Sequence, residues 1–217
     1  MRFRAVLFDL DGTLLDTLAD IAHAANSVLD GLGLPTHPEE AYRQFIGEGI
    51  AVLFRRALGD GEEGQVDRCV AAFREEYGRT WNVRTRPYEG IPELLDALTG
   101  QRVALTLLSN KPDAFTQLCA GHYLARWPFR VVLGAREGVP RKPDPAAAGE
   151  IAGRLGLEPS AFVYLGDSAV DMQTARRAGM YPVGASWGFR PVTELLDGGA
   201  EVIVDQPLEL LDVLGDS

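Results

Sequence analysis

Short apolar runs recur along the chain, and each ends at polar residues or at glycine. They cover residues 3–8, 103–108, 130–133, 162–165, 181–184 and 202–204. Several runs are continuous rather than alternating, which is typical of strands buried on both faces of a parallel sheet. Helical patterns lie between the later runs, at residues 91–98, 112–120, 145–155 and 169–178. This alternation predicts βαβ units and an α/β fold with a doubly wound, Rossmann-like parallel sheet.

One long interval carries helical patterns only. Between about Thr17 and Arg86 the apolar residues repeat at helical spacing in three stretches, and glycines at 31 and 33 end the first. The pattern predicts an all-helical cap domain, residues 17–86, inserted into an α/β core of residues 1–16 and 87–217. The alternative is that these helices simply cover one face of the sheet.

Composition and charge narrow the possible partners. The chain has 217 residues, 46% hydrophobic and 24% charged, which is ordinary for a globular protein of one domain with a smaller insert. Its formal net charge of -10 argues against nucleic acid and anionic membranes as partners. No stretch approaches the roughly 20 apolar residues of a transmembrane helix. Cys69 and Cys119 lack metal-ligand spacing, so we expect reduced, mostly buried thiols and a cytoplasmic location.

The first candidate site follows the first predicted strand. Asp9 and Asp11 flank a single residue and lead into Gly12 and Thr13. Two carboxylates that follow a strand and precede a glycine turn can belong to one site. One can attack phosphorus while the other transfers the proton of the leaving group. A turn cap or a solvated acidic loop is the alternative.

Two further segments could bind an anion. Ser109 and Asn110 follow a predicted strand, and a small hydroxyl before a helix start offers a side-chain donor and free backbone N–H groups to a phosphate. An ordinary helix N-cap is the alternative there. Lys142 stands in a loop that Pro143 and Pro145 stiffen, although most such lysines are surface residues.

Lysine is scarce in this chain. Lys111 and Lys142 are the only lysines among 21 basic residues, and all the others are arginine. In a chain so biased toward arginine, a retained lysine suggests that a compact, deprotonatable point charge is needed. This favours a functional Lys142 and leaves Lys111 open, with chance placement as the alternative.

The last segment combines two acids. Asp167 lies at the end of a predicted strand and Asp171 follows one helical turn later, so both carboxylates can face one point. Mg²⁺ prefers oxygen ligands, few of them protein carboxylates, with water and phosphate completing its octahedron. The alternative for Asp167 is an acid that suits the dipole of a helix N-terminus.

Taken together, the four segments resemble a known set of motifs. The ordered sequences DLDGTLLDT, LSNK, RKPDP and GDSAVD are similar to the four signature motifs of the haloacid dehalogenase superfamily. The helical insert resembles the cap of its C1 subgroup, and TRPYEGIPELLDAL, ARRAGM and WGF resemble its phosphoglycolate phosphatase branch. The resemblance covers essentially the whole chain and implies a magnesium-dependent phosphatase.

The resemblance also implies a role for each site residue. Asp9 would form an aspartyl-phosphate, while Asp11 protonates the leaving oxygen and then activates water. Lys142 would neutralise charge on the nucleophile and the phosphate, and Asp171 would orient Lys142 or metal-bound water. The implied phosphate contacts are Ser109, the backbone of Asn110, Gly12 and Thr13. The implied ligands of Mg²⁺ are the Asp9 carboxylate, the Asp11 main-chain carbonyl and Asp167.

The expected partner is a small phosphorylated metabolite, bound by a monomer or a homodimer, with phosphoglycolate as the leading substrate. An inorganic pyrophosphatase or a phosphosugar phosphatase or mutase of the same superfamily is the alternative. Dehalogenases lack an acid at the position of Asp11, and phosphonatases use a cap lysine that residues 17–86 do not contain. A non-catalytic phospho-ligand-binding protein would be expected to lack at least one of the four key residues Asp9, Asp11, Lys142 and Asp167.

Substrate choice is expected to depend on the cap. Glycines in the segment 45–50 would let backbone approach a ligand, and a helix that follows could favour an anion; a mere connector between helices is the alternative. Arg55 and Arg56 are expected on a solvated face, although they could reach a substrate carboxylate. Trp187 is a candidate for the rim of the site.

Overall fold

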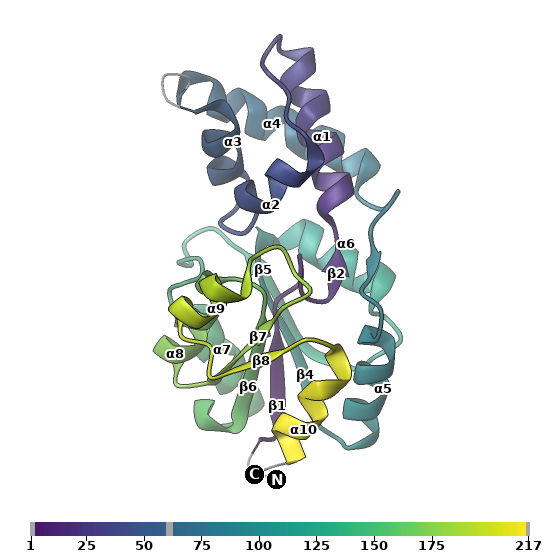
Figure 1. The fold of residues 1–217 in the computed structure, drawn as a ribbon, viewed down its shortest axis with the longest axis vertical. Coiled ribbons are helices and arrows are strands. Elements are labelled where there is room, and N and C mark those ends of the chain that lie inside the picture. Colours follow the sequence, from purple (N-terminus) through teal and green to yellow (C-terminus); the bar gives the residue numbers. More distant parts are fainter. Residues whose placement is uncertain (1–2, 60–62, 216–217) are drawn as a thin grey trace.

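The computed structural model describes residues 3–59 and 63–215, and its centre is a six-stranded parallel sheet (Figure 1). The strand order is β5-β4-β1-β6-β7-β8. The strands are β1 Ala5–Phe8, β4 Ala104–Pro112, β5 Phe129–Ala135, β6 Phe162–Gly166, β7 Tyr181–Ala185 and β8 Val202–Val204. Each overlaps the apolar run that predicted it, so the doubly wound parallel sheet is confirmed.

Helices follow the strands along the chain. They are α5 Ile91–Gly100, α6 Asp113–Tyr123, α7 Ala146–Leu155, α8 Ala169–Ala178, α9 Val192–Gly198 and α10 Leu210–Gly215, with the 3₁₀ turns η2 Pro159–Ala161 and η3 Pro207–Glu209. The sequence did not predict α9 and α10. These helices have 7 and 6 residues, fewer than two turns, so a 3.6-residue repeat cannot be recognised in them. No helix in the two described ranges has the length and apolarity needed to cross a membrane.

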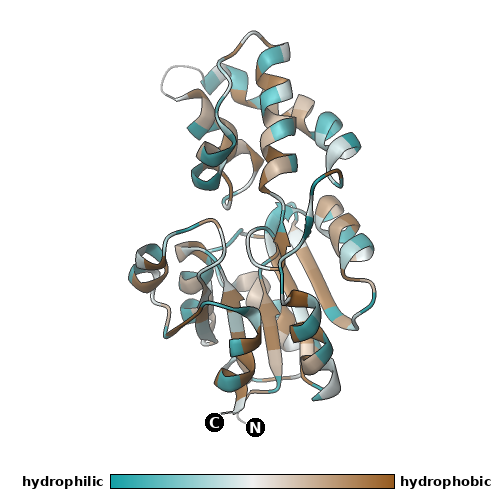
Figure 2. Cartoon of the chain, turned by 45° about the vertical axis from the view of Figure 1, so that its right-hand side comes forward, coloured by the Kyte–Doolittle hydropathy of each residue, from teal (hydrophilic) through white to brown (hydrophobic). Residues whose placement is uncertain are grey.

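The strands are continuously apolar because both faces of the sheet are covered. Val6 and Phe8 of β1 belong to a hydrophobic cluster that includes residues of α5 and α10. The alternate residues Ala5 and Leu7 belong to a second cluster, which includes residues of α7 and α8. Figure 2 shows the resulting layer of hydrophobic strands between helices whose outer surfaces are more polar.

The helices of the long interval pack together beyond one end of the sheet (Figure 1). They are α1 Leu18–Gly31, η1 Glu39–Ala41, α2 Tyr42–Phe45, α3 Ile50–Leu58 and α4 Glu63–Thr80. Tyr42, Phe54 and Phe73 are buried in a hydrophobic cluster that these helices share. The helical block therefore has a core of its own, distinct from the two clusters on the sheet.

A short antiparallel ribbon was not predicted. It pairs β2, Leu15–Asp16, with β3, Arg86–Pro87, where the chain enters and leaves the helical block. Strands of two residues are too short to show an alternating pattern. They form because the two ends of the insert are brought together by the fold.

The strand order places β1 at a topological switch point. The chain visits β4 and β5 on one side of β1 and then crosses to β6, β7 and β8 on the other. In open α/β sheets, ligands bind at the carboxyl ends of the strands at such a point. The helical block stands at this edge of the sheet (Figure 1).

One local prediction about β4 is wrong. The strand continues through Ser109 to Pro112, and α6 begins only at Asp113 with Pro112 as its N-cap. Ser109 is therefore not a helix N-cap and does not adjoin a helix start. The extension ends where Pro112 pairs with Ala135 of β5, a contact that the local sequence could not reveal.

A buried carboxylate joins the two ends of the helical block. Asp20, in the first turn of α1, is 2% exposed. It accepts hydrogen bonds from the backbone N–H groups of Arg84 and Thr85 and from the Thr85 hydroxyl, at 2.8–2.9 Å. Charge-assisted bonds of this kind fix the start of α1 to the chain that returns from α4.

We expect Asp20→Ala to lower the free energy of unfolding by about 2–4 kcal/mol, because it leaves three donors without their acceptor. Chemical denaturation would measure the change. Asp30→Ala, an exposed site on the same helix, is the matched control and should change stability by less than about 0.5 kcal/mol. Equal effects of the two substitutions would contradict the prediction.

Candidate active site

All four sequence segments meet at the carboxyl edge of the sheet. Asp9 follows β1, Ser109 lies in β4, Lys142 lies in the loop between β5 and α7, and Asp167 follows β6. Each of these residues is buried, with at most 7% of its surface exposed. The fold therefore gathers residues that are more than 150 positions apart in the sequence into one site.

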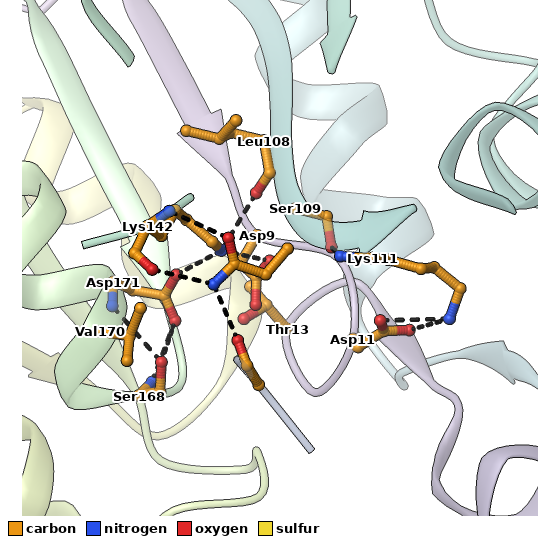
Figure 3. Close-up of polar contacts among 12 residues, drawn as sticks. Asp9, Asp11, Thr13, Leu108, Ser109, Lys111, Lys142, Ser168, Val170 and Asp171 are labelled. Atoms are coloured by element: carbon orange, nitrogen blue, oxygen red, sulfur yellow. Dashed lines mark hydrogen bonds and ion pairs between the residues drawn. The ribbon is translucent and has the colours of Figure 1, made fainter. Parts of the chain in front are cut away.

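The ammonium group of Lys142 is the charged centre of this site. Its Nζ donates hydrogen bonds to Asp9 Oδ1 and Asp171 Oδ1, both at 2.7 Å, and to the carbonyl oxygen of Leu108 at 3.2 Å (Figure 3). Burial alone would lower the pKa of Lys142, but Asp171 and Asp9 outweigh it and hold the pKa well above its usual value. The lysine thus supplies a fixed compact charge, and the expectation that it must be deprotonatable is not supported.

Asp171 uses its two carboxylate oxygens differently. Oδ1 accepts from Lys142 and from the hydroxyl of Tyr164 at 3.2 Å, whereas Oδ2 accepts from the N–H and the hydroxyl of Ser168 at 3.2 and 2.5 Å. Ser168 and Asp171 form a capping box at the start of α8. The helix-terminal role that the sequence suggested for Asp167 thus belongs to Asp171, which also holds Lys142.

Three buried carboxylates could hold a divalent cation. Asp9, Asp167 and Asp171 each offer an oxygen within 4.8 Å of the other two. Burial first, and the charge of Asp171 second, raise the pKa of Asp9 well above its usual value and that of Asp167 to about 7. The single ammonium of Lys142 does not offset the mutual repulsion of the three carboxylates. Their oxygen atoms are the donors that a hard divalent cation prefers. Asp171 accepts two hydrogen bonds at each oxygen, whereas one is accepted by Asp9 and two by Asp167, so Asp9 and Asp167 are the more available ligands.

Glycines leave room for the Asp167 carboxylate. A Cβ at Gly12 would lie 2.2 Å from Asp167 Oδ2, and one at Gly188 would lie 2.5 Å from the same oxygen. Gly12 also has φ of +89°, which other residues rarely adopt. Thr13 Oγ1 and the Phe189 N–H donate to the carboxylate at 3.5 and 2.7 Å. Gly12 thus leaves space for the Asp167 carboxylate, and Thr13 donates a hydrogen bond to it. Contact of Gly12 and Thr13 with phosphate stays a prediction.

Asp11 forms a second ion pair, with Lys111. The Lys111 Nζ donates to both carboxylate oxygens of Asp11, at 2.8 and 3.2 Å. Burial alone would lower the pKa of Lys111, but Asp11 outweighs it and the pKa is raised. Figure 3 shows this pair to one side of the cluster around Lys142. Lys111, whose role the sequence left open, therefore lies within the site.

The side chain of Asn110 connects the loop of Lys142 to Gly47 of the helical block. Its Oδ1 accepts from the Lys142 N–H at 3.0 Å, and its Nδ2 donates to the carbonyl oxygens of Lys142 and Gly47 at 3.1 and 3.0 Å. Ser109 Oγ accepts from the N–H of Lys111 at 3.2 Å. Sequence reasoning considered only the backbone of Asn110, since the partners of its side chain are 32 and 63 positions away.

A cavity of about 60 Å³ lies between this site and the helical block. On the sheet side it is lined by Asp9, Asp11, Ser109, Asn110, Lys111, Asp167 and Ser168. On the other side, Ile46, Gly47, Gly49 and Ile50 line it together with residues of α1, α3 and α4. The prediction that the segment 45–50 faces the site is therefore confirmed.

Phe189 and Arg190 also line the cavity, and sequence reasoning missed Arg190 as a site residue. Arg190 Nη2 donates to the Ile46 carbonyl at 2.7 Å, and its Nη1 donates to the carbonyl of Arg43. Phe189 is buried in the cluster of the helical block. These two residues connect the loop after β7 to the helices. The only local signal for Arg190 in the sequence was the adjacent WGF triplet. One more arginine does not stand out in a chain whose basic residues are nearly all arginine.

Other candidates lie elsewhere. Trp187 donates from Nε1 to the carbonyl of Thr13 at 3.0 Å and is not among the described residues that line the cavity. Arg55 and Arg56 each pair with a glutamate at the surface, as expected for a solvated face. The rim role considered for Trp187 is therefore replaced by structural support of the loop that carries Thr13.

The fold and this site define a haloacid dehalogenase-like hydrolase, and the chain belongs to that family. The family model matches residues 6–185, which contain all four motif segments. A crystal structure described as a predicted phosphoglycolate phosphatase from Haemophilus somnus 129PT superimposes with a TM-score of 0.91 over 99% of each chain, at 29% identity.

Curated relatives are similar over most of the chain. A phosphoglycolate phosphatase of Pseudomonas fluorescens Pf0-1 is 32% identical over 96% of this chain and 78% of its own length. An N-acetylmuramic acid 6-phosphate phosphatase of Pseudomonas aeruginosa PAO1 is 33% identical over 99% of this chain and 96% of its own length. The relatives thus share a reaction class but not one substrate.

If the three carboxylates hold a divalent cation, we expect Gly188→Ala to weaken its binding roughly 10- to 100-fold, because the added methyl group displaces the Asp167 carboxylate. Isothermal titration of the protein with Mg²⁺ would measure the affinity. Gly149→Ala, on the exposed side of α7 with open space around it, is the matched control and should give the same affinity as the original chain. Unchanged affinity in Gly188→Ala would show that the metal does not depend on Asp167.

Proposed function

We propose that the protein is a magnesium-dependent phosphatase that hydrolyses a small phosphate monoester through an aspartyl-phosphate on Asp9. The observation that carries this proposal is the 2.7 Å contact between Asp9 and the Lys142 ammonium at the floor of a cavity. A carboxylate can approach a phosphate only if nearby positive charge offsets their repulsion. The phosphatase names of the relatives support the same reaction.

The residues of the site suit the two halves of this reaction. Asp9 attacks phosphorus and the ester P–O bond breaks, while Asp11, protonated when the substrate is bound, gives its proton to the leaving oxygen and becomes the carboxylate that Lys111 holds. Asp11 then takes a proton from water, and the water oxygen displaces Asp9 from phosphorus. Lys142 offsets negative charge throughout, and Ser109 with the N–H of Asn110 holds the phosphoryl oxygens.

The proposed ligands of Mg²⁺ are the Asp9 carboxylate, the main-chain carbonyl of Asp11 and the Asp167 carboxylate. When bound, the cation would supply positive charge between carboxylate and phosphate. Asp171 remains outside this ligand set, since it holds Lys142 in place through Oδ1 and caps α8 through Oδ2.

Phosphoglycolate is the leading substrate. Several relatives at 32–34% identity carry the name phosphoglycolate phosphatase. The cavity of about 60 Å³ suits a small leaving group, since pockets for drug-sized ligands measure roughly 300–1,000 Å³. Its many apolar residues disfavour pyrophosphate more strongly than phosphoglycolate, because a leaving phosphate carries more negative charge than glycolate and has no methylene group to contact them.

A phosphosugar is the second candidate. A neighbouring cavity of about 460 Å³ shares Gly47, Ser168 and Arg190 with the first, so a larger leaving group could extend into it. The name of the relative from Pseudomonas aeruginosa, an N-acetylmuramic acid 6-phosphate phosphatase, supports this alternative.

The proposed cap comprises residues 17–86, and residues 1–16 and 87–217 form the proposed catalytic core. Support comes from the separate hydrophobic cluster of the helices and from the ribbon β2–β3 near both limits. Free, buried thiols at Cys69 and Cys119 accord with a cytoplasmic location. The proposed partner is a small phosphorylated metabolite, bound by a monomer or a homodimer.

We expect Asp9→Asn to abolish Mg²⁺-dependent release of phosphate from p-nitrophenyl phosphate, because an amide cannot act as the nucleophile. Asp11→Asn should lower kcat by about 10²- to 10⁴-fold, since it removes the general acid and base. Removing Mg²⁺ with a chelator should also abolish activity, and added Mg²⁺ should restore it.

Asp16→Asn is the matched control, a partly exposed acid on β2 outside the cavity-lining residues. It should retain the original kcat. Turnover by Asp9→Asn equal to that of the original chain would exclude the aspartyl-phosphate mechanism.

A screen of phosphorylated metabolites with Mg²⁺, ranked by kcat/KM, would test the substrate. We expect 2-phosphoglycolate to rank above N-acetylmuramic acid 6-phosphate, because the cavity at the site is small, and above pyrophosphate, because its leaving phosphate carries more charge than glycolate. A flat profile would defeat the phosphoglycolate assignment while leaving the phosphatase intact.

A further inference from the structure

The hydroxyl of Tyr77 is buried and makes no hydrogen bond of normal length and angle within residues 3–59 and 63–215, although the Lys111 ammonium is near enough to act on it. Tyr77 lies on α4 and is 1% exposed. Four buried side-chain atoms in the described part of the chain lack a partner, and Tyr77 is the only residue among them that lines the cavity. An unpaired hydroxyl costs free energy on burial, so such a group points to a bound water or ligand that completes it.

The Lys111 ammonium stands beside Tyr77. Its Nζ lies 4.8 Å from the centre of the Tyr77 ring, and both residues line the same cavity. An ammonium has three N–H donors, and the hydrogen bonds of this one within the described ranges go to the carboxylate of Asp11. Lys111 can therefore offer a donor to a ligand without losing Asp11.

The neighbouring wall of the cavity is apolar. Ile21, Leu53, Phe73 and Phe115 line the cavity, and the ring centres of Phe73 and Phe115 lie 5.2 and 5.1 Å from that of Tyr77. The other cation that lines the cavity, Arg190, donates to backbone carbonyls of the helical block and pairs with Glu194. An anionic group on a leaving group would thus find its donors at Lys111 and Tyr77, while the apolar surface would exclude water from the contact.

Lys111 and Tyr77 also lie on the side of the site where the leaving group of the substrate is expected. Asp11, the proposed proton donor to the ester oxygen, is the residue that Lys111 holds. A group one or two bonds beyond that oxygen would therefore lie close to the Lys111 ammonium. In phosphoglycolate, a carboxylate occupies this place, one methylene beyond the ester oxygen.

We propose that the Tyr77 hydroxyl and the Lys111 ammonium form a subsite for a carboxylate carried by the leaving group. The subsite rests on the proposed phosphatase function and sharpens it, because it names the substrate class: small phosphate monoesters with a carboxylate next to the ester carbon. Tyr77 comes from α4 and Lys111 from β4, so the subsite is completed only when the helical block stands over the sheet.

Tyr77→Phe tests the subsite, because it removes one hydroxyl and keeps the ring. Steady-state kinetics would compare 2-phosphoglycolate with ethyl phosphate, which has a methyl group in place of the carboxylate. We expect kcat/KM for 2-phosphoglycolate to fall about 10- to 100-fold, mostly through KM, and kcat/KM for ethyl phosphate to stay within about twofold.

Tyr123→Phe is the matched control. Tyr123 also has a buried hydroxyl without a partner, but it is not among the described residues that line the cavity. It should leave both substrates unaffected. An equal loss for both substrates in Tyr77→Phe, or no loss for either, would overturn the carboxylate subsite.

Lys111→Met provides a second measurement that does not depend on Tyr77. It also removes the partner of Asp11, so kcat should fall for both substrates, and the informative quantity is their ratio. We expect the preference for 2-phosphoglycolate over ethyl phosphate to collapse in Lys111→Met, and the double variant to lose little further preference because the two residues bind one group. A preserved preference in Lys111→Met would overturn the proposal.

The outcomes separate the subsite from the phosphatase. If the original chain shows Asp9-dependent turnover of ethyl phosphate but no preference for 2-phosphoglycolate, the subsite is overturned and the phosphatase stands. If Asp9→Asn retains full turnover, the proposed function fails, and the subsite fails with it.

Discussion

One buried ammonium shared between two carboxylates is the interaction on which the site depends. Lys142 contacts Asp9, Asp171 and the carbonyl of Leu108, which come from three separate elements around β1. Without this cation, the carboxylates at the strand ends would repel each other in a buried setting, and an unpaired buried charge is strongly destabilising. The same contact that stabilises the folded edge of the sheet also places a positive charge beside Asp9, the proposed nucleophile.

The two lysines of the chain perform different tasks. Lys142 is not among the described residues that line the cavity, but it contacts Asp9, which does line it and is proposed to attack phosphorus. Lys111 lines the cavity and faces Asp11 and Tyr77, on the side where the leaving group would lie. An arginine could not replace either of them easily, because its planar guanidinium is larger and needs several acceptors at fixed angles.

The site and the helical block are mechanically connected. Asn110 joins the loop of Lys142 to the carbonyl of Gly47, and Arg190 joins the loop after β7 to Ile46. A shift of the helices relative to the sheet would change these contacts together with the cavity. The helices that line the cavity and the charged residues at the sheet edge are therefore parts of one arrangement.

The sequence by itself determined the sheet, most of its helices and the segments that carry the chemistry. Continuous apolar runs reveal buried strands, and acids at their ends, such as Asp9 and Asp167, fall where parallel strands present ligands. Only the tertiary structure decided that β4 runs on to Pro112, that the Asn110 side chain braces Lys142, and that Arg190 and Tyr77 reach the cavity. These features arise from contacts between residues 23 to 144 positions apart, and no local pattern of hydrophobicity or charge encodes such distances.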